Sequence, residues 1–136
     1  MKSILVSACL LGTPCRWHGR AARPSWAVRK YLTEHPDVKV VPMCPEQLGG
    51  LPTPRPPVKV RSGRVYETCA DKERRDDVTG ADVTAAFIAG AQATLAIARK
   101  HGCTFAILCK SSPSCARTGF AGRLLAENGV EVVNTF

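Results

Sequence analysis

The sequence predicts an α/β domain with a mostly parallel sheet, flanked by helices in a three-layer-like arrangement and interrupted by one long loop rich in proline and glycine. Short strand-like apolar runs alternate along the chain with runs of helical periodicity, which is typical of parallel α/β folds. The 136 residues are 45% hydrophobic, enough for one core of ordinary size. We therefore expect residues 1–136 to form a single domain.

The first third of the chain supplies two strands and a helix. Ser3–Ala8 (SILVSA) is a strand-sized apolar run. Ser25–Glu34 follows as a short helix, with Pro24 before it and Pro36 closing it. The next strand covers about Val38–Val41, and the alternation of strand and helix favours parallel pairing.

A long loop, Pro42–Thr68, comes next, with a minor hairpin around Ser62–Gly63. Loops of this length inside a compact domain are usually either functional or disordered. Because valine, leucine and tyrosine are interspersed among its prolines, we expect an ordered and functional loop.

The rest of the chain repeats the alternation. Asp82 is placed to cap a helix whose apolar residues recur at helical spacing until His101–Gly102 ends it. Phe105–Leu108 (FAIL) is then a buried strand, Ala121–Glu127 a short helix, and Val130–Val133 a final strand.

The composition limits the partners of the protein. Nineteen Lys and Arg against eleven Asp and Glu give a formal charge of +8, which favours anionic partners such as phosphates, nucleotides or RNA. No aromatic-rich RNA-binding signature lies between the basic residues, so a small phosphorylated substrate is favoured over an extended nucleic-acid surface, which stays open. No run approaches the roughly 20 apolar residues of a membrane span, and no signal peptide is evident, so we expect a cytoplasmic protein without membrane contact.

The cysteines indicate metal or thiol chemistry. There are seven of them, an odd number, in a chain without a secretory signal, so a complete disulfide framework is not favoured. Working sites of parallel sheets lie beyond the carboxyl ends of the strands. Cys9 follows the first strand, Cys44 lies three residues past the second, and Cys109 and Cys115 follow FAIL, so these can converge. Cys103 enters FAIL from its far end and should be remote.

Three convergent thiolates leave one coordination position of a metal centre free. An iron–sulfur cluster held by three cysteines has this property, and so does a catalytic zinc with three protein ligands. Free cysteines can also simply pack as small hydrophobic residues, which we expect for Cys69 and Cys103.

Four sequence motifs carry a resemblance to a known protein family. They are "SACLLGTPCRWHG" (Ser7–Gly19), "CPEQLGGLPTPRPP" (Cys44–Pro57), "DVTAAFIAGA" (Asp82–Ala91) and "SSPSC" (Ser111–Cys115). In this order, over nearly the whole chain, the sequence resembles the thiouracil desulfidase family. The sequence departs from the family pattern in several places. Trp17-His18 replaces Tyr-Asp, Cys109 stands in the place of a lysine, Ala116 replaces a glycine and Lys59 a glutamate, and the loop after Cys115 is shorter.

The resemblance implies a non-redox desulfurase with a 4Fe-4S cluster bound by Cys9, Cys44 and Cys115, the open iron binding the sulfur of a thiolated pyrimidine. Water would replace that sulfur on carbon, and hydrogen sulfide would leave. Cys15, six residues past Cys9, is an alternative ligand or an auxiliary thiol. Protein prepared in air can lose such a cluster.

Proton transfer requires an acid and a base. Glu46 is two residues from Cys44 and is held by Pro45, and Ser112 lies three residues before Cys115. By resemblance, Glu46 and Ser112 are the catalytic pair.

Three further residues are candidates for binding substrate. Arg16 and Arg55 suit a carbonyl or phosphate, and Gly49 allows close backbone approach. The substrate itself is a thiolated uracil, either the free base or a phosphorylated form. Two other hypotheses stay open: a non-catalytic module that carries a cluster, zinc or persulfide, and a module that binds thiolated tRNA.

Overall fold

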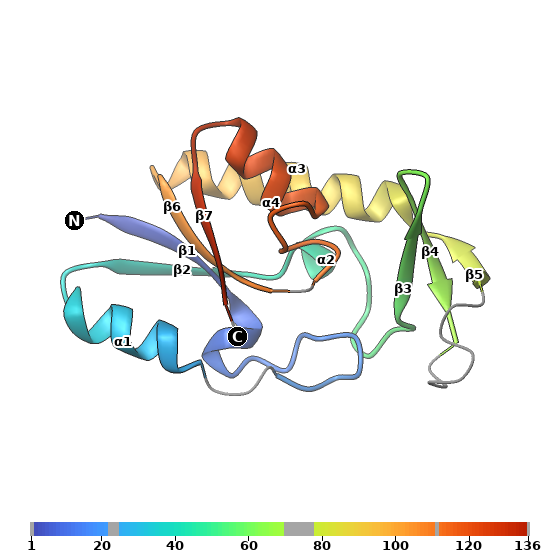
Figure 1. Cartoon of the computed structure of the whole chain (residues 1–136), viewed down its shortest axis with the longest axis horizontal. Helices are drawn as coiled ribbons and strands as arrows, with labels where there is room; N and C mark the ends of the chain where they lie inside the picture. Colours follow the sequence, from blue (N-terminus) through green and yellow to red (C-terminus); the bar gives the residue numbers. More distant parts are fainter. Residues whose placement is uncertain (1, 22–24, 70–77, 111, 136) are drawn as a thin grey trace.

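A parallel sheet of four strands forms the centre of the computed structural model, which describes residues 2–21, 25–69, 78–110 and 112–135 (Figure 1). Its strands are β1 (Ser3–Ser7), β2 (Lys39–Met43), β6 (Phe105–Cys109) and β7 (Glu131–Thr135). They lie in the order β2-β1-β6-β7, and every neighbouring pair is parallel. The predicted α/β class with a mostly parallel sheet is therefore confirmed.

Helices cover both faces of this sheet. α1 (Trp26–Glu34) connects β1 to β2, α3 (Thr84–Lys100) leads into β6, and α4 (Phe120–Glu127) connects β6 to β7. Because such crossovers are right-handed, the reversal of direction after β2 places α1 on one face and α3 with α4 on the other, as Figure 1 shows. No helix in the described part of the chain has the length and apolarity of a membrane span.

The core explains why these segments form. Ile4, Leu5 and Val6 of the inner strand β1 are fully buried, and so is Leu108 of β6. Strands that are covered on both faces carry such unbroken apolar runs, which made them visible in the sequence. The Oγ of Ser25 accepts a hydrogen bond from the Val28 amide at 3.2 Å, so it is the cap of α1. Pro24, which we expected before this helix, lies outside the described residues.

A second, antiparallel sheet stands beside the first. It consists of β3 (Val58–Arg61), β4 (Arg64–Thr68) and β5 (Val78–Asp82). Ser62 and Gly63 both have positive φ, as two-residue hairpin turns of type I′ require, so the predicted hairpin is confirmed. β5 was not predicted, because its sequence VTGAD lacks an apolar alternation.

The long loop contains more regular structure than predicted. β2 extends to Met43, and Pro42 is tolerated because β2 is an edge strand. A short helix, α2 (Pro45–Leu48), begins at once, with Cys44 as N-cap and Pro45 at its first position. Cys44 therefore follows its strand directly and not three residues later.

Candidate functional site

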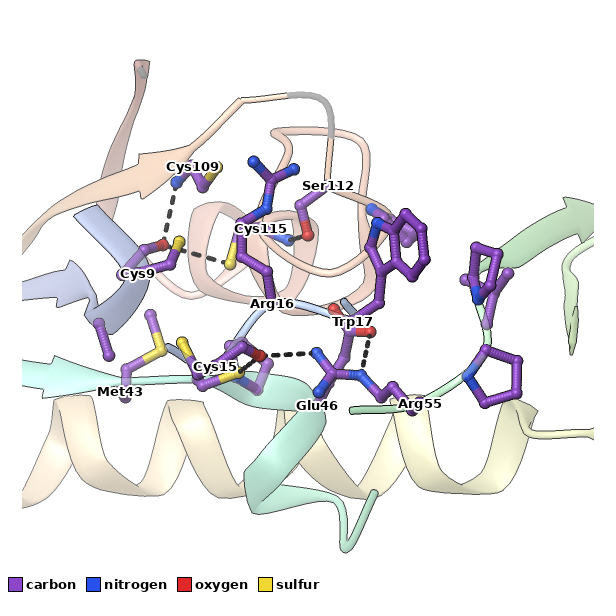
Figure 2. A pocket seen from close by; sticks show the side chains of 18 residues that line it. Cys9, Cys15, Arg16, Trp17, Met43, Glu46, Arg55, Cys109, Ser112 and Cys115 are labelled. Carbon is purple, nitrogen blue, oxygen red and sulfur yellow. Dashed lines mark hydrogen bonds and ion pairs between the residues drawn. The ribbon is translucent and has the colours of Figure 1, made fainter. Parts of the chain in front are cut away.

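A cavity of about 270 Å³ opens at the carboxyl ends of the parallel strands (Figure 2). The chain leaves β1 toward β2 on one side and later adds β6 on the other, so the ends of β1 and β6 form the switch point where ligands bind in open α/β sheets. The cavity is lined by Ser7, Ala8, Cys9, Cys15, Arg16, Trp17, Met43, Cys44, Pro45, Glu46, Arg55, Pro56, Pro57, Val58, Cys109, Ser112, Pro113 and Cys115.

Five of the seven cysteines line this cavity, and all are free thiols. Cys9 lies in the 3-10 turn η1 (Ala8–Leu11) directly after β1, and its thiol interacts with those of Cys15 and Cys109. The Cys15 thiol also interacts with that of Cys44. Among the described residues no three His, Cys, Asp or Glu side chains converge closely enough to hold a single metal ion, so the thiols surround a space and do not meet at a point.

Ser7 ties two of these cysteines together. Its buried Oγ accepts a hydrogen bond from the Cys109 amide at 2.9 Å and donates one to the Cys115 Sγ at 3.3 Å. The Asn134 side chain of β7 donates to the Cys115 carbonyl at 2.9 Å. Cys115 is thus bonded to the ends of β1 and β7, and through Ser7 it is linked to the end of β6. Ser7 was not predicted as a site residue, although it is the first residue of the motif that contains Cys9.

Arg55 organises the other side of the cavity. Its guanidinium is buried and forms an ion pair with Glu46, with Nε 3.2 Å from Oε1. It also donates to the Thr53 Oγ1 at 2.9 Å and to the Cys15 carbonyl at 3.0 Å. These bonds occupy the group that we had assigned to substrate, so the structure favours a positioning role: Arg55 fixes Glu46 and the Cys15 loop.

Ser112 lies on the cavity wall above Cys115. Its Oγ accepts hydrogen bonds from the amides of Ser114 and Cys115, both at 3.2 Å. The Ser112 side chain also hydrogen-bonds to the Cys115 thiol, which acts to lower the pKa of that thiol against the larger effect of burial. The preceding motif residue, Ser111, lies outside the described residues.

The thiols differ in how readily they ionise. Hydrogen bonds from Cys44 and Cys9, with the Arg55 guanidinium, lower the pKa of Cys15 to about 3. A hydrogen bond from Cys9 lowers the pKa of Cys109 to about 7. The pKa values of the two donors, Cys9 and Cys44, are raised, and burial raises the pKa of Cys115 to about 12. Negative charge at neutral pH therefore collects first on Cys15.

The remaining sequence candidates lie in different places. Arg16 lines the cavity and its charge helps to lower the pKa of Cys109. Gly49 is not a lining residue: a Cβ there would stand 2.0 Å from the Ala86 carbonyl oxygen of α3. Its small size serves the contact between α2 and α3, which gives no support to a role in binding substrate. Cys69 and Cys103 are not among the residues that line the cavity.

Comparison with known proteins agrees with this architecture. The family model described as 2-thiouracil desulfurase matches residues 4–134. This chain belongs to the 2-thiouracil desulfurase family. A relative is the protein YbbK of Bacillus subtilis (strain 168), described as uncharacterized, which is 36% identical over 132 residues, covering 93% of this chain and 85% of YbbK.

A solved structure of similar fold is the [4Fe-4S]-dependent thiouracil desulfidase TudS. It is 32% identical to this chain, with a TM-score of 0.78, and the match covers 98% of this chain and 91% of TudS. The family resemblance of the sequence motifs is therefore confirmed for this member of the desulfurase family.

Proposed function

We propose that this protein is an iron–sulfur-dependent desulfidase that hydrolyses the C=S bond of a thiolated pyrimidine, namely 2- or 4-thiouracil as base or nucleotide. The products are the uracil derivative and hydrogen sulfide. The observation that carries the proposal is one cavity at the switch point that five thiols line together with Glu46 and Ser112. Family membership and the likeness to TudS support it.

The donor set fits a cluster. Thiolates are the ligands of iron–sulfur clusters, and ligands of separate irons stand apart from one another. Cys9, Cys44 and Cys115 come from three segments. The direct partners of each thiol are residues outside this set of three, so the three thiols stand apart from one another. Cys15 interacts with both Cys9 and Cys44, so it is poorly placed to bind a further iron beside them. We assign the ligands to Cys9, Cys44 and Cys115.

When bound, the cluster would supply a soft Lewis acid for the thiocarbonyl sulfur, which makes the adjacent carbon more electrophilic. Glu46 then takes a proton from water, whose oxygen bonds to that carbon. Ser112 donates a hydrogen bond to the reacting groups. The C–S bond breaks as the carbonyl forms, and the departing sulfide takes up both protons of the water, one returned by Glu46 and the other released from the former water oxygen. One water enters and one hydrogen sulfide leaves, without net oxidation.

The decisive experiment measures sulfide release from 2-thiouracil, 4-thiouracil and their nucleotides by protein reconstituted with iron and sulfide without air. We expect stoichiometric uracil derivative and sulfide. Absence of sulfide from every thiopyrimidine, in protein that holds its iron, would refute the reaction and leave the cluster assignment standing.

A second candidate function is a carrier of a cluster or persulfide. The two cavity thiols beyond the assigned ligands, Cys15 and Cys109, favour it, since a thiolate that binds no iron stays available as a nucleophile. The Glu46→Gln variant separates the two functions. It should keep iron and lose turnover in an enzyme, whereas cluster transfer by a carrier should be unchanged.

A further inference from the structure

We propose that Trp17 determines the specificity of this site, because its indole is the stacking surface for the flat ring of the substrate. The cavity would then select a thiocarbonyl group carried by an aromatic heterocycle over the same group in an acyclic molecule. This inference rests on the proposed desulfidase function and assigns the part of the site that recognises the ring.

The cavity has two chemically different ends. In Figure 2 the thiols of Cys9 and Cys109 lie at one end, and the Trp17 indole stands at the other, beyond Ser112. The lining also includes a run of nonpolar residues, Pro56–Val58. A substrate whose sulfur points toward the thiols therefore presents its ring to a wall of flat, nonpolar surface.

The backbone that carries the indole is held firmly. Trp17 lies in a tight turn closed by hydrogen bonds from the Arg16 amide to the Arg20 carbonyl, 3.1 Å, and from the Gly19 amide to the Arg16 carbonyl, 2.9 Å. The Trp17 carbonyl accepts a hydrogen bond from the Arg55 amide at 2.7 Å. The residue that fixes Glu46 thus also fixes the turn of Trp17.

The surroundings of the indole suit stacking. Trp17 is half-buried, and the His18 ring lies against it with centroids 5.0 Å apart. A preordered indole loses little conformational entropy when a ligand binds. Pyrimidines stack on aromatic side chains through their π-faces, whether they are bases or nucleotides. Thiourea has the same sulfur and no aromatic ring, so it gains little from such a wall.

The test measures binding of uracil, 2-thiouracil and thiourea to the reconstituted protein by titration calorimetry. Trp17→Leu should weaken binding of both pyrimidines about tenfold, the size of stacking losses in other base-binding proteins, and leave thiourea binding unchanged. Trp17→Phe should restore most of the pyrimidine affinity. The matched control is Trp26→Leu, since Trp26 is the other tryptophan and is 77% exposed on α1. This control should change none of the three affinities.

Steady-state kinetics adds a second measurement. Trp17→Leu should raise KM more than it lowers kcat, and the thermal midpoints of Trp17→Leu and Trp17→Phe should match. Equal uracil affinity in the Leu and Phe variants, or an equal loss of thiourea binding, would overturn the inference. Because uracil binding requires no turnover, a weaker uracil affinity in Trp17→Leu would support the stacking role of Trp17 even if the protein released no sulfide. If the protein releases sulfide but the Leu and Phe variants bind uracil equally well, the stacking role is wrong and the desulfidase function stands.

Discussion

The two walls of the cavity are built in different ways. The strand-end wall comprises Ser7, Cys9, Cys109 and Cys115, which the ends of β1, β6 and β7 hold through backbone and short side-chain bonds. The loop wall comprises Cys15, Trp17, Cys44, Glu46 and Arg55. The Arg55 side chain bonds to Glu46 and to the Cys15 carbonyl, and the Arg55 backbone amide bonds to the Trp17 carbonyl. Sheet pairing is spread over many hydrogen bonds, whereas the loop wall depends on one buried cation. The loop wall should therefore be the easier one to disable.

Removing an assigned cluster ligand should have the largest effect on activity. This effect should be the same whether the cysteine lies in the strand-end wall or in the loop wall. Cys9→Ser, Cys44→Ser and Cys115→Ser should each lose most of the roughly four irons of a 4Fe-4S cluster and all sulfide release. Iron and sulfide analysis of the anaerobic proteins measures this. Cys69→Ser, outside the cavity lining, is the control and should keep its iron. Loss of iron in Cys15→Ser with retention in Cys44→Ser would move the ligand to Cys15.

Removing the carboxylate should disable chemistry alone. Glu46→Gln should lower kcat by about 10²- to 10⁴-fold, the usual contribution of a general acid–base group, while iron content stays unchanged. Single-turnover sulfide release by the variant and the unchanged protein, compared at equal iron content, measures this loss of rate. Unchanged turnover would show that the water is activated by another group.

Removing the Arg55 cation should affect the loop wall and spare the strand-end wall. Arg55→Met leaves the Glu46 carboxylate, whose side chain is 14% exposed, without its partner, and should lower the free energy of unfolding by about 3 to 5 kcal/mol. Turnover should fall because Glu46 loses its orientation. Denaturant titration measures the stability change.

The Arg64–Asp82 ion pair offers the matched control. It lies in the antiparallel sheet with side chains 58% and 33% exposed, and because solvent screens such a pair, Arg64→Met should change the free energy of unfolding far less than Arg55→Met. Equal losses in the two variants would show that Arg55 has no special role.

Ser7→Ala tests the strand-end wall. It leaves the buried Cys109 amide without its acceptor and should lower the free energy of unfolding by about 1 to 3 kcal/mol. Because strand pairing still positions Cys9 and Cys109, we expect iron content to survive, as measured by metal analysis. Loss of iron comparable with Cys115→Ser would mean that Ser7, and not the sheet, places the ligand.

The smallest effect concerns protonation in protein without a cluster. Since the pKa of Cys15 is lowered to about 3 and that of Cys109 to about 7, two thiolates should be present just above neutral pH. Ultraviolet titration should show one thiolate already in mild acid, absent from Cys15→Ser, and a second near neutrality, absent from Cys109→Ser. A single transition in the alkaline range would contradict this charge distribution.

The sequence was informative where local signals sufficed. The apolar runs of β1 and β6, the extent of α1 and the long apolar face of α3 were recognisable, with element ends off by one or two residues. The rule on carboxyl ends correctly gathered four cysteines at one cavity. Local patterns could not reveal β5, whose strand character comes from pairing with β4, or α2, which is too short for periodicity.

The side-chain network could not be predicted at all. Arg55 meets Glu46 nine residues away and Cys15 forty residues away, and no periodicity encodes such contacts. The same is true of Ser7, whose partners lie more than a hundred residues along the chain. The sequence therefore predicted which cysteines would lie at the cavity, but not which side chains would hold the cavity residues in position.

The contact between α2 and α3 limits how this cavity can be redesigned. The Gly90 backbone touches the Pro45 carbonyl and Gly49 touches Ala86, with no room for a Cβ at either glycine. The first turn of α2, which bears Glu46, therefore rests on the longest helix of the molecule and cannot retreat. Room for bulkier thiolated substrates is therefore better sought at Pro56–Val58, which line the cavity outside the contact between α2 and α3.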